Sequence, residues 1–215
     1  LLLFRMGDFY ELFFDDAIQA AAALDITLTR RGKTEGEDIP MCGVPWHSYE
    51  VYLHKLIKAG QKVAICEQME SPEEAKKRGA KSVVRREVVR IITAGTLVED
   101  GLLDARQANY LVCVVHRSGE IGLSWVDMST GEFVTGTSSK QTLTADLARL
   151  SPTELLISEQ CAKESFFLEA FAEYRNKLTI QVNSLFDYAK AIDKLKSTFG
   201  VATIDGFGHF STLQI

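Results

Sequence analysis

The sequence predicts a mixed α/β (α+β) protein of two domains, and three observations support this fold class. The chain has 215 residues, of which 46% are hydrophobic and 25% charged, a composition typical of globular chains with one large or two modest domains. Short strand-like and helix-like segments are interspersed along its first hundred residues. Beyond residue 100, three successive strand-like runs precede an alternation of helices and strands, which indicates a separate α/β domain.

The first domain is expected over residues 1–96, with two helices at 16–24 and 48–59. Asp15 and Asp16 are placed to cap the first helix. In the second helix, Tyr52, Leu56 and Ala59 have helical spacing, and a glycine follows at position 60. Strand-like runs surround the helices at 1–6, 9–14, 62–66 and 86–93.

A polar segment at 94–109 is a plausible connection, so we expect a linker at 97–107 and a second domain at 108–215. Three strand-like runs joined by tight turns, at 110–116, 121–127 and 131–136, predict an antiparallel meander. Helix, strand, helix, strand and helix are then expected at 142–150, 154–158, 163–174, 178–181 and 184–199.

Charge and cysteine content limit the class of protein. The net charge of −5 argues against coating nucleic acid by bulk charge, although seven basic residues and one acidic residue lie between Lys76 and Arg90. That basic stretch is either a solvated face or a local contact for phosphates. The four cysteines are far apart, without a C-x-x-C pair, which favours reduced thiols in a cytoplasmic protein. No apolar run is long enough to span a membrane, and because the chain begins with Leu1 we expect a piece of a longer protein.

Catalytic and cofactor patterns are weak in this sequence. Gly32-Lys33-Thr34 lacks the first glycine of a phosphate-binding loop, because Thr27 stands in its place. His47, His54 and Cys42 lack the spacing of a metal site, so structural roles are favoured. We therefore expect no cofactor and no metal in this chain.

Asp127, at the end of a predicted strand, is the best candidate for a metal-binding carboxylate. A nuclease needs several converging acids, but the following strands offer Glu154 at a strand start and no matching acid beyond it. An aspartate that stabilises the turn before Ser129 is the better interpretation. A nuclease centred on Asp127 stays an alternative, to be tested by metal-dependent cleavage.

The segment Gly7 to Phe14 departs from a simple core strand. With period two, Tyr10, Leu12 and Phe14 share one face, which we expect to be buried. The other face carries Glu11 between two phenylalanines, and burying an unpaired carboxylate is costly. We therefore expect Glu11 to be exposed, with Phe9 exposed beside it as part of a contact surface.

Ordered sequence blocks extend this interpretation to a family. They are FRMGDFYELF at 4–13, LTRRG at 28–32, IPM at 39–41, GVP at 43–45, His47, VAICEQ at 63–68 and VVRIITAGT at 88–96. In this order they resemble the start of the MutS family of bacterial DNA mismatch-repair proteins. The run DARQAN at 104–109, the meander and GFG at 206–208 continue the match, so the resemblance covers essentially the whole chain.

The resemblance implies that the first domain recognises mismatched double-stranded DNA. The family's Phe-x-Glu motif falls on Phe9 and Glu11: Phe9 would enter the minor groove and stack on a mispaired or unpaired base, and Glu11 would hydrogen-bond that base. Arg31 and Arg86 (or its neighbour Arg85) would lie near the DNA backbone, and Met6 would line the same groove.

For the second domain, the resemblance implies a ribonuclease-H-like connector without a nuclease centre. It would relay mismatch binding to the ATPase and to the partner MutL. ATP, magnesium and the main dimer interface would belong to domains outside this chain, which would itself be non-catalytic and cytoplasmic, associated with the nucleoid. A protein-interaction module that does not bind DNA through Phe9 stays a second alternative.

Overall fold

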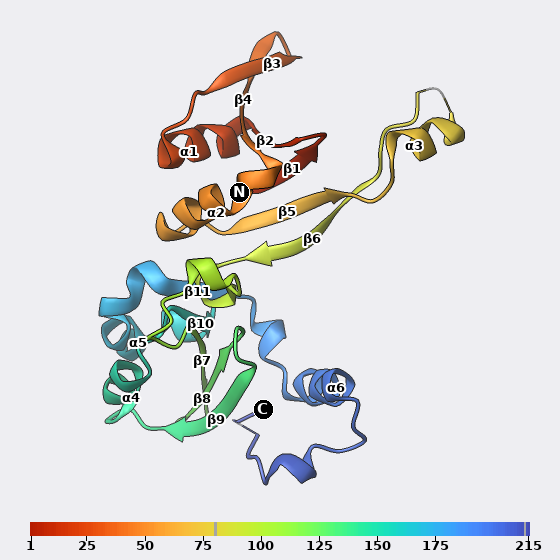
Figure 1. Ribbon diagram of the computed structural model, residues 1–215. Coiled ribbons are helices and arrows are strands. Elements are labelled where there is room, and N and C mark those ends of the chain that lie inside the picture. The colour runs from red at the N-terminus through yellow and green to blue at the C-terminus, as the bar shows by residue number, and fades with distance from the viewer. Residues whose placement is uncertain (80, 213) are drawn as a thin grey trace. The chain divides into compact units, whose positions relative to one another are not determined.

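A computed structural model describes residues 1–79, 81–212 and 214–215 (Figure 1). The described chain divides into two compact units, unit 1 from Leu1 to Ala94 and unit 2 from Gly95 to Ile215. Each unit contains a mixed β-sheet with helices, which confirms the predicted fold class. Within the described residues, no helix combines the length and apolar character needed to cross a membrane.

Unit 1 is built on a six-stranded sheet in the order β3-β4-β2-β1-β5-β6. Its strands are β1 (Leu2–Met6), β2 (Phe9–Phe13), β3 (Thr29–Thr34), β4 (Glu37–Pro45), β5 (Val63–Gln68) and β6 (Arg86–Ile92). Strands β1 and β5 run parallel, and the other neighbouring pairs run antiparallel. The hairpin of β1 and β2 therefore lies in the middle of the sheet, which fixes both its strands from both sides.

Helices α1 (Phe14–Leu24) and α2 (Tyr49–Lys58) pack on one face of this sheet. The Cys42 thiol of β4 contacts the Ala17 carbonyl of α1, and the rings of Tyr10 and Tyr49 lie 5.2 Å apart. The buried side chains Tyr10, Leu12, Cys42, Val44, Leu53, Leu56, Val63 and Ile65 make up much of the core. Alternation along β2 then places Phe9, Glu11 and Phe13 on the opposite face of the sheet.

Several expectations for unit 1 need correction. Phe14 is 54% exposed and not in the core, because its backbone turns into the left-handed region (φ 54°) where α1 begins. Asp15 and Asp16 do not cap α1; they lie in its first turn, and Asp16 accepts a hydrogen bond from the Leu2 amide. Along α2, Leu53, Leu56 and Ile57 are buried, whereas Ala59 is exposed.

Two strands and one α-helix of unit 1 were not anticipated from the sequence: β3, β4 and the short helix α3 (Pro72–Arg78). All six residues of β3 are exposed, so the strand carries no alternation of apolar and polar side chains. Two prolines interrupt the apolar pattern of β4. Helix α3 begins with a capping box formed by Ser71 and Glu74, a local signal that was present in the sequence.

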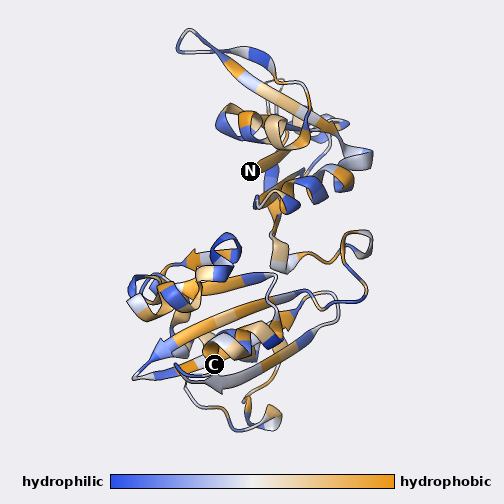
Figure 2. Cartoon of the chain, turned by 90° about the vertical axis from the view of Figure 1, so that its left-hand side faces the viewer, coloured by the Kyte–Doolittle hydropathy of each residue, from blue (hydrophilic) through white to orange (hydrophobic). Residues whose placement is uncertain are grey.

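Unit 2 contains a five-stranded sheet in the order β11-β10-β7-β8-β9. The strands are β7 (Tyr110–Arg117), β8 (Glu120–Asp127), β9 (Glu132–Ser138), β10 (Glu154–Ser158) and β11 (Leu178–Gln181). Strands β7, β8 and β9 form the predicted antiparallel meander, and β10 runs parallel to both β7 and β11. Figure 2 shows the hydrophobic residues distributed along these strands.

The α-helices among the described residues of unit 2 are α4 (Leu143–Leu150), α5 (Ser165–Ala170) and α6 (Tyr188–Phe199). The helix expected at 163–174 is shorter because Phe171 leaves the helical backbone (φ −98°, ψ 10°) while its buried ring stacks on Phe167. Helix α6 begins later than expected because Asp187 caps it, accepting a hydrogen bond from the Lys190 amide. Strands and helices pack around one apolar core that includes Val112, Val114, Leu123, Leu147, Leu155, Phe167 and Phe171.

The four cysteines are free thiols, three of them buried and Cys113 partly covered in β7. Burial raises the pKa of the Cys113 thiol to about 12 and also raises the pKa values of Cys42 and Cys66. The thiols of Cys42, Cys66 and Cys113 are therefore protonated near neutral pH and are poor nucleophiles.

Candidate nucleic-acid interface

The turn between β1 and β2, at Gly7 and Asp8, is held in place by contacts from both sides of the hairpin. The Gly7 amide donates to Gln68 Oε1 (3.0 Å), and the Trp46 amide donates to the Asp8 carbonyl (2.9 Å). Arg5 Nε donates to the Gly7 carbonyl (2.5 Å). Gly7 has a left-handed backbone (φ 61°), which favours glycine at this position. The side chain that follows the turn is thus presented from a fixed backbone.

That side chain is Phe9, the first residue of β2, and 48% of it is exposed, as the sequence predicts. Its cross-strand neighbours are Met6 on β1 and Pro45 on β4. Met6 is half-buried, so the tip of the hairpin presents an apolar ring bordered by apolar side chains.

Glu11 lies on the same face of β2 as Phe9 but is less exposed than expected. Only 14% of its side chain is exposed, and its Oε2 accepts a hydrogen bond from Arg31 Nη1 at 2.5 Å. The cost of covering this carboxylate is offset by the guanidinium, which the sequence argument did not supply. The sequence therefore predicted a more exposed Glu11 side chain than the structure shows.

Arg31 reaches Glu11 from β3, two strands away in the sheet. It lies where the pairing of β3 with β4 shifts register, next to Gly32 with its left-handed backbone (φ 72°). On the intervening β4, Gly43 is directly opposite Glu11, and a Cβ added there would lie 3.7 Å from Glu11 Cγ. The contact between Arg31 and Glu11 thus occurs where β3 shifts register and where the strand between them carries a glycine, Gly43.

The structure places Arg86 differently from Arg31. Its Nε donates to the Arg5 carbonyl (2.8 Å), its Nη1 donates to the Val84 carbonyl (2.9 Å), and its guanidinium lies 5.0 Å from the centre of the Phe4 ring. Arg86 is half-buried by these contacts, whereas its neighbour Arg85 is exposed. The main role of Arg86 in the described structure is to tie β6 to β1.

Sequence reasoning missed the contacts that anchor the middle residue of the Phe-x-Glu segment. The Tyr10 hydroxyl donates to Glu67 on β5, and Arg5 lies over both Tyr10 (5.6 Å) and Trp46 (4.2 Å). Burial, assisted by the Glu67 hydrogen bond, raises the pKa of Tyr10, so the phenol stays protonated. The alternation along β2 indicated that Tyr10 is buried, but it could not indicate Glu67, which lies 57 residues away.

Unit 2 does not gather its acids into a metal site among the described residues. Asp127 accepts hydrogen bonds from the Asn109 amide and from the amide and hydroxyl of Ser129, which confirms its role in the turn. Glu154 is also buried and accepts from the Gly95 amide (3.0 Å) and the Thr179 hydroxyl (2.5 Å).

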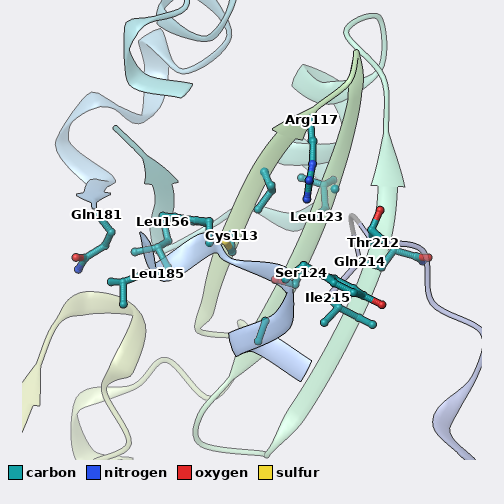
Figure 3. A pocket seen from close by; sticks show the side chains of 15 residues that line it. Cys113, Arg117, Leu123, Ser124, Leu156, Gln181, Leu185, Thr212, Gln214 and Ile215 are labelled. Carbon is teal, nitrogen blue, oxygen red and sulfur yellow. The ribbon is translucent and has the colours of Figure 1, made fainter. Parts of the chain in front are cut away.

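The remaining candidates also have structural positions. Gly32, Lys33 and Thr34 lie within β3, not in a strand–loop–helix phosphate loop. A cavity of about 170 Å3 lies against β7 and β8, lined by Cys113, Leu123, Leu156 and their neighbours (Figure 3). An apolar hollow of about 950 Å3 lies between β9 and α6. Neither has an acidic side chain among its described lining residues.

Comparison with known proteins identifies both parts of the chain. A family model described as MutS domain I matches residues 1–101, and one described as MutS domain II matches residues 109–215. The chain belongs to the MutS family. The DNA mismatch repair protein MutS of Wolbachia pipientis wMel is 48% identical over 215 residues. The match covers 100% of this chain and 25% of that protein, so the chain spans a quarter of this relative's length.

The family assignment confirms the resemblance drawn from the ordered blocks. Unit 1 corresponds to MutS domain I and unit 2 to MutS domain II. The hairpin that carries Phe9 and Glu11 therefore belongs to MutS domain I.

Proposed function

We propose that this chain is the mismatch-recognition and connector part of a DNA mismatch-repair protein, and that Phe9 is the wedge. The observation that carries the proposal is the half-exposed Phe9 ring next to a turn fixed by three hydrogen bonds. An apolar wedge in the minor groove unstacks a base step and kinks the duplex, at a cost that is lowest where pairing is already defective. Stacking on an aromatic ring tolerates any base, so recognition would follow weak pairing and not sequence.

Glu11 supplies the second part of the recognition in this proposal. Its carboxylate accepts a hydrogen bond from a base N–H, and to bond a purine N7 it must carry a proton. Against a fully paired duplex, the same carboxylate faces phosphates without gaining a base contact. Glu11 would therefore lower the affinity for matched DNA and sharpen discrimination.

The other predicted DNA contacts have unequal support. Arg31 is half-exposed on the Glu11 face and is paired with Glu11, so a contact with a phosphate would require it to leave that carboxylate. Met6 borders Phe9 across the hairpin and would line the groove beside it. Arg86 uses two of its donors within unit 1, so a DNA contact would rely on the remaining donors of its guanidinium.

We further propose that unit 2 is a non-catalytic connector. Its buried acids, Asp127 and Glu154, are occupied by hydrogen bonds of the fold, which argues against a nuclease centre. In the complete protein this domain would relay mismatch binding to the ATPase and to MutL. ATP, magnesium and dimerisation would be supplied by other domains, and the protein would act in the cytoplasm, associated with the nucleoid.

Binding by the full-length protein tests the role of Phe9. We expect Phe9→Ala to reduce the preference for a duplex with one unpaired base by about ten-fold or more, since base–aromatic stacking contributes roughly 1 to 3 kcal/mol. Binding is measured at two salt concentrations to separate recognition from backbone attraction. Phe133→Ala is the matched control, because Phe133 on β9 is also 48% exposed. A preference that survives Phe9→Ala would refute the wedge.

A further inference from the structure

The ion pair between Arg31 and Glu11 joins two groups that would play opposite roles against DNA. Glu11 is mostly covered, with 14% of its side chain exposed, and it extends from a central strand of the sheet. Arg31 extends from the outermost strand β3, and half of its side chain is exposed. Arg31 is therefore the member of the pair that is better placed to move.

Charge chemistry gives Arg31 two alternative acceptors. A guanidinium binds carboxylates and phosphates through the same planar fork of N–H donors. Ion pairs with a solvent-exposed member are weak in water, so a phosphate brought close by bound DNA competes effectively with Glu11. As long as Glu11 has no other donor, however, releasing Arg31 leaves a mostly covered carboxylate without its counterion.

We propose that Arg31 exchanges Glu11 for a DNA phosphate only when a mispaired or unpaired base takes over the Glu11 carboxylate. On a fully paired duplex, Glu11 receives no base donor and retains Arg31. On mismatched DNA, the base hydrogen-bonds Glu11 and frees Arg31 to contact the backbone. Arg31 is then a specificity-determining residue, since it adds a phosphate contact that depends on the base contact. This inference rests on the proposed role of Glu11 in mismatch recognition.

The neighbouring arginine offers a matched control. Arg30 also lies on β3 and is exposed, but it pairs with Asp38 at 2.7 Å, and Lys33 lies 3.8 Å from the same carboxylate. Its partner is not Glu11, so its contribution should not depend on the state of the base. Arg30 and Arg31 thus differ in their acceptor while sharing strand and charge, and at least half of each side chain is exposed.

The salt dependence of binding counts the phosphate contacts that each duplex receives. The slope of log Kobs against log [salt] is negative and steepens with each phosphate contact. For the full-length protein, we expect Arg31→Ala to reduce the magnitude of this slope by about 0.9 on a duplex with one unpaired base, equivalent to one phosphate contact. The slope on the fully paired duplex should stay unchanged. Arg30→Ala should change the two slopes equally, and Arg31→Lys, which keeps the charge, should retain most of the mismatch-dependent slope.

A substitution of Glu11, the other member of the pair, also tests the exchange. Glu11→Gln removes the charge that holds Arg31, so the slope on the fully paired duplex should become steeper by about 0.9. In the double variant Glu11→Gln with Arg31→Ala, that gain should disappear. The Glu11→Gln measurement is informative even if the single variant Arg31→Ala does not fold.

The outcomes separate the exchange from simpler roles and from the proposed function. An equal loss of slope on both duplexes in Arg31→Ala would mean a permanent phosphate contact, and no loss on either would mean a purely structural pair; both overturn the exchange. Phe9→Ala in the same assay is the separate test of the proposed function. If Phe9→Ala abolishes the mismatch preference while the Arg31 slopes do not differ, the exchange alone fails.

Discussion

The buried acids of unit 2 and Glu11 of unit 1 are used in different ways. In unit 2, Asp127 and Glu154 are 3% and 5% exposed, and each accepts two or more hydrogen bonds from backbone amides or hydroxyls. In unit 1, Glu11 accepts from Arg31, whose half-exposed side chain extends from the outer strand of the sheet. Acids bonded to the backbone cannot change partners without disrupting the fold, whereas an acid bonded to a surface arginine can. The difference distinguishes structural acids from an acid available for recognition.

The same contrast holds for the aromatic residues. Phe167 and Phe171 are almost fully buried and stack on each other in the core of unit 2. Phe9 is half-exposed at a turn whose backbone is fixed by its neighbours. A rigid backbone beneath an exposed ring stabilises one presentation of that ring, which a wedge requires. Substitutions at Glu154, Asp127, Tyr10 and Phe9 test these contrasts.

The largest loss of stability is expected from Glu154→Ala. The substitution leaves the buried Gly95 amide and Thr179 hydroxyl without an acceptor, so the free energy of unfolding of unit 2 should fall by about 3 kcal/mol. Denaturant unfolding is followed by the fluorescence of Trp125 in a Trp46→Phe background, because the chain has one tryptophan in each unit. Glu159→Ala, at an exposed site after the same strand, is the control. An equal loss of unfolding free energy in Glu154→Ala and Glu159→Ala would show that Glu154 does not stabilise unit 2.

Asp127→Asn should have a smaller effect that depends on pH. Burial alone would raise the pKa of Asp127, but hydrogen bonds from Ser129, Asn109 and Thr130 outweigh it and hold the pKa below its ordinary value of 3.8. Because the pKa of Asp127 is lower in the folded protein than in the unfolded chain, ionised Asp127 stabilises the fold at pH values above its unfolded-state pKa. This stabilisation is lost as the pH falls through the folded-state pKa.

We therefore expect Asp127→Asn to reduce the free energy of unfolding by about 1.5 kcal/mol near neutral pH. The difference in the free energy of unfolding between Asp127→Asn and the wild type should become smaller below about pH 4. Trp125 fluorescence measures unfolding across that range, with the exposed Asp193→Asn as control. If metal-dependent DNA cleavage is found in the wild type and lost in Asp127→Asn, the structural assignment of Asp127 is wrong.

Tyr10→Phe tests the anchor beneath the recognition hairpin. The substitution removes the hydroxyl that donates to Glu67 and leaves that carboxylate without this donor. The free energy of unfolding of unit 1 should fall by about 1 kcal/mol, measured through Trp46 in a Trp125→Phe background. The free energy of unfolding of unit 2, read through Trp125 in a Trp46→Phe background, should not change. A loss in both units would mean that the effect does not act through this hydrogen bond.

Phe9→Ala should have the smallest effect on stability. Half of the ring is already exposed, so the free energy of unfolding of unit 1 should change by less than about 0.5 kcal/mol. The same variant should lose its mismatch preference in DNA binding. A large loss of stability would place Phe9 with the core aromatics and remove the contrast between the two kinds of ring.

The sequence by itself determined the local features of this protein. Period-two alternation placed Tyr10 and Leu12 inside and Phe9 outside, and the turn residues after Asp127 defined the end of β8. The ordered blocks also identified the family, because many short matches in one order are more specific than any single motif. These signals are readable because each depends on residues that are close in the chain.

The tertiary structure decided which groups meet. Arg31 and Glu11 are 20 residues apart, Tyr10 and Glu67 are 57 apart, and Gly95 and Glu154 are 59 apart. These contacts follow from the strand orders and helix packing, which alternation along a single strand cannot specify. Glu11 is consequently covered because β3 pairs with β4 and brings a guanidinium within 2.5 Å, although its own strand predicts an exposed carboxylate.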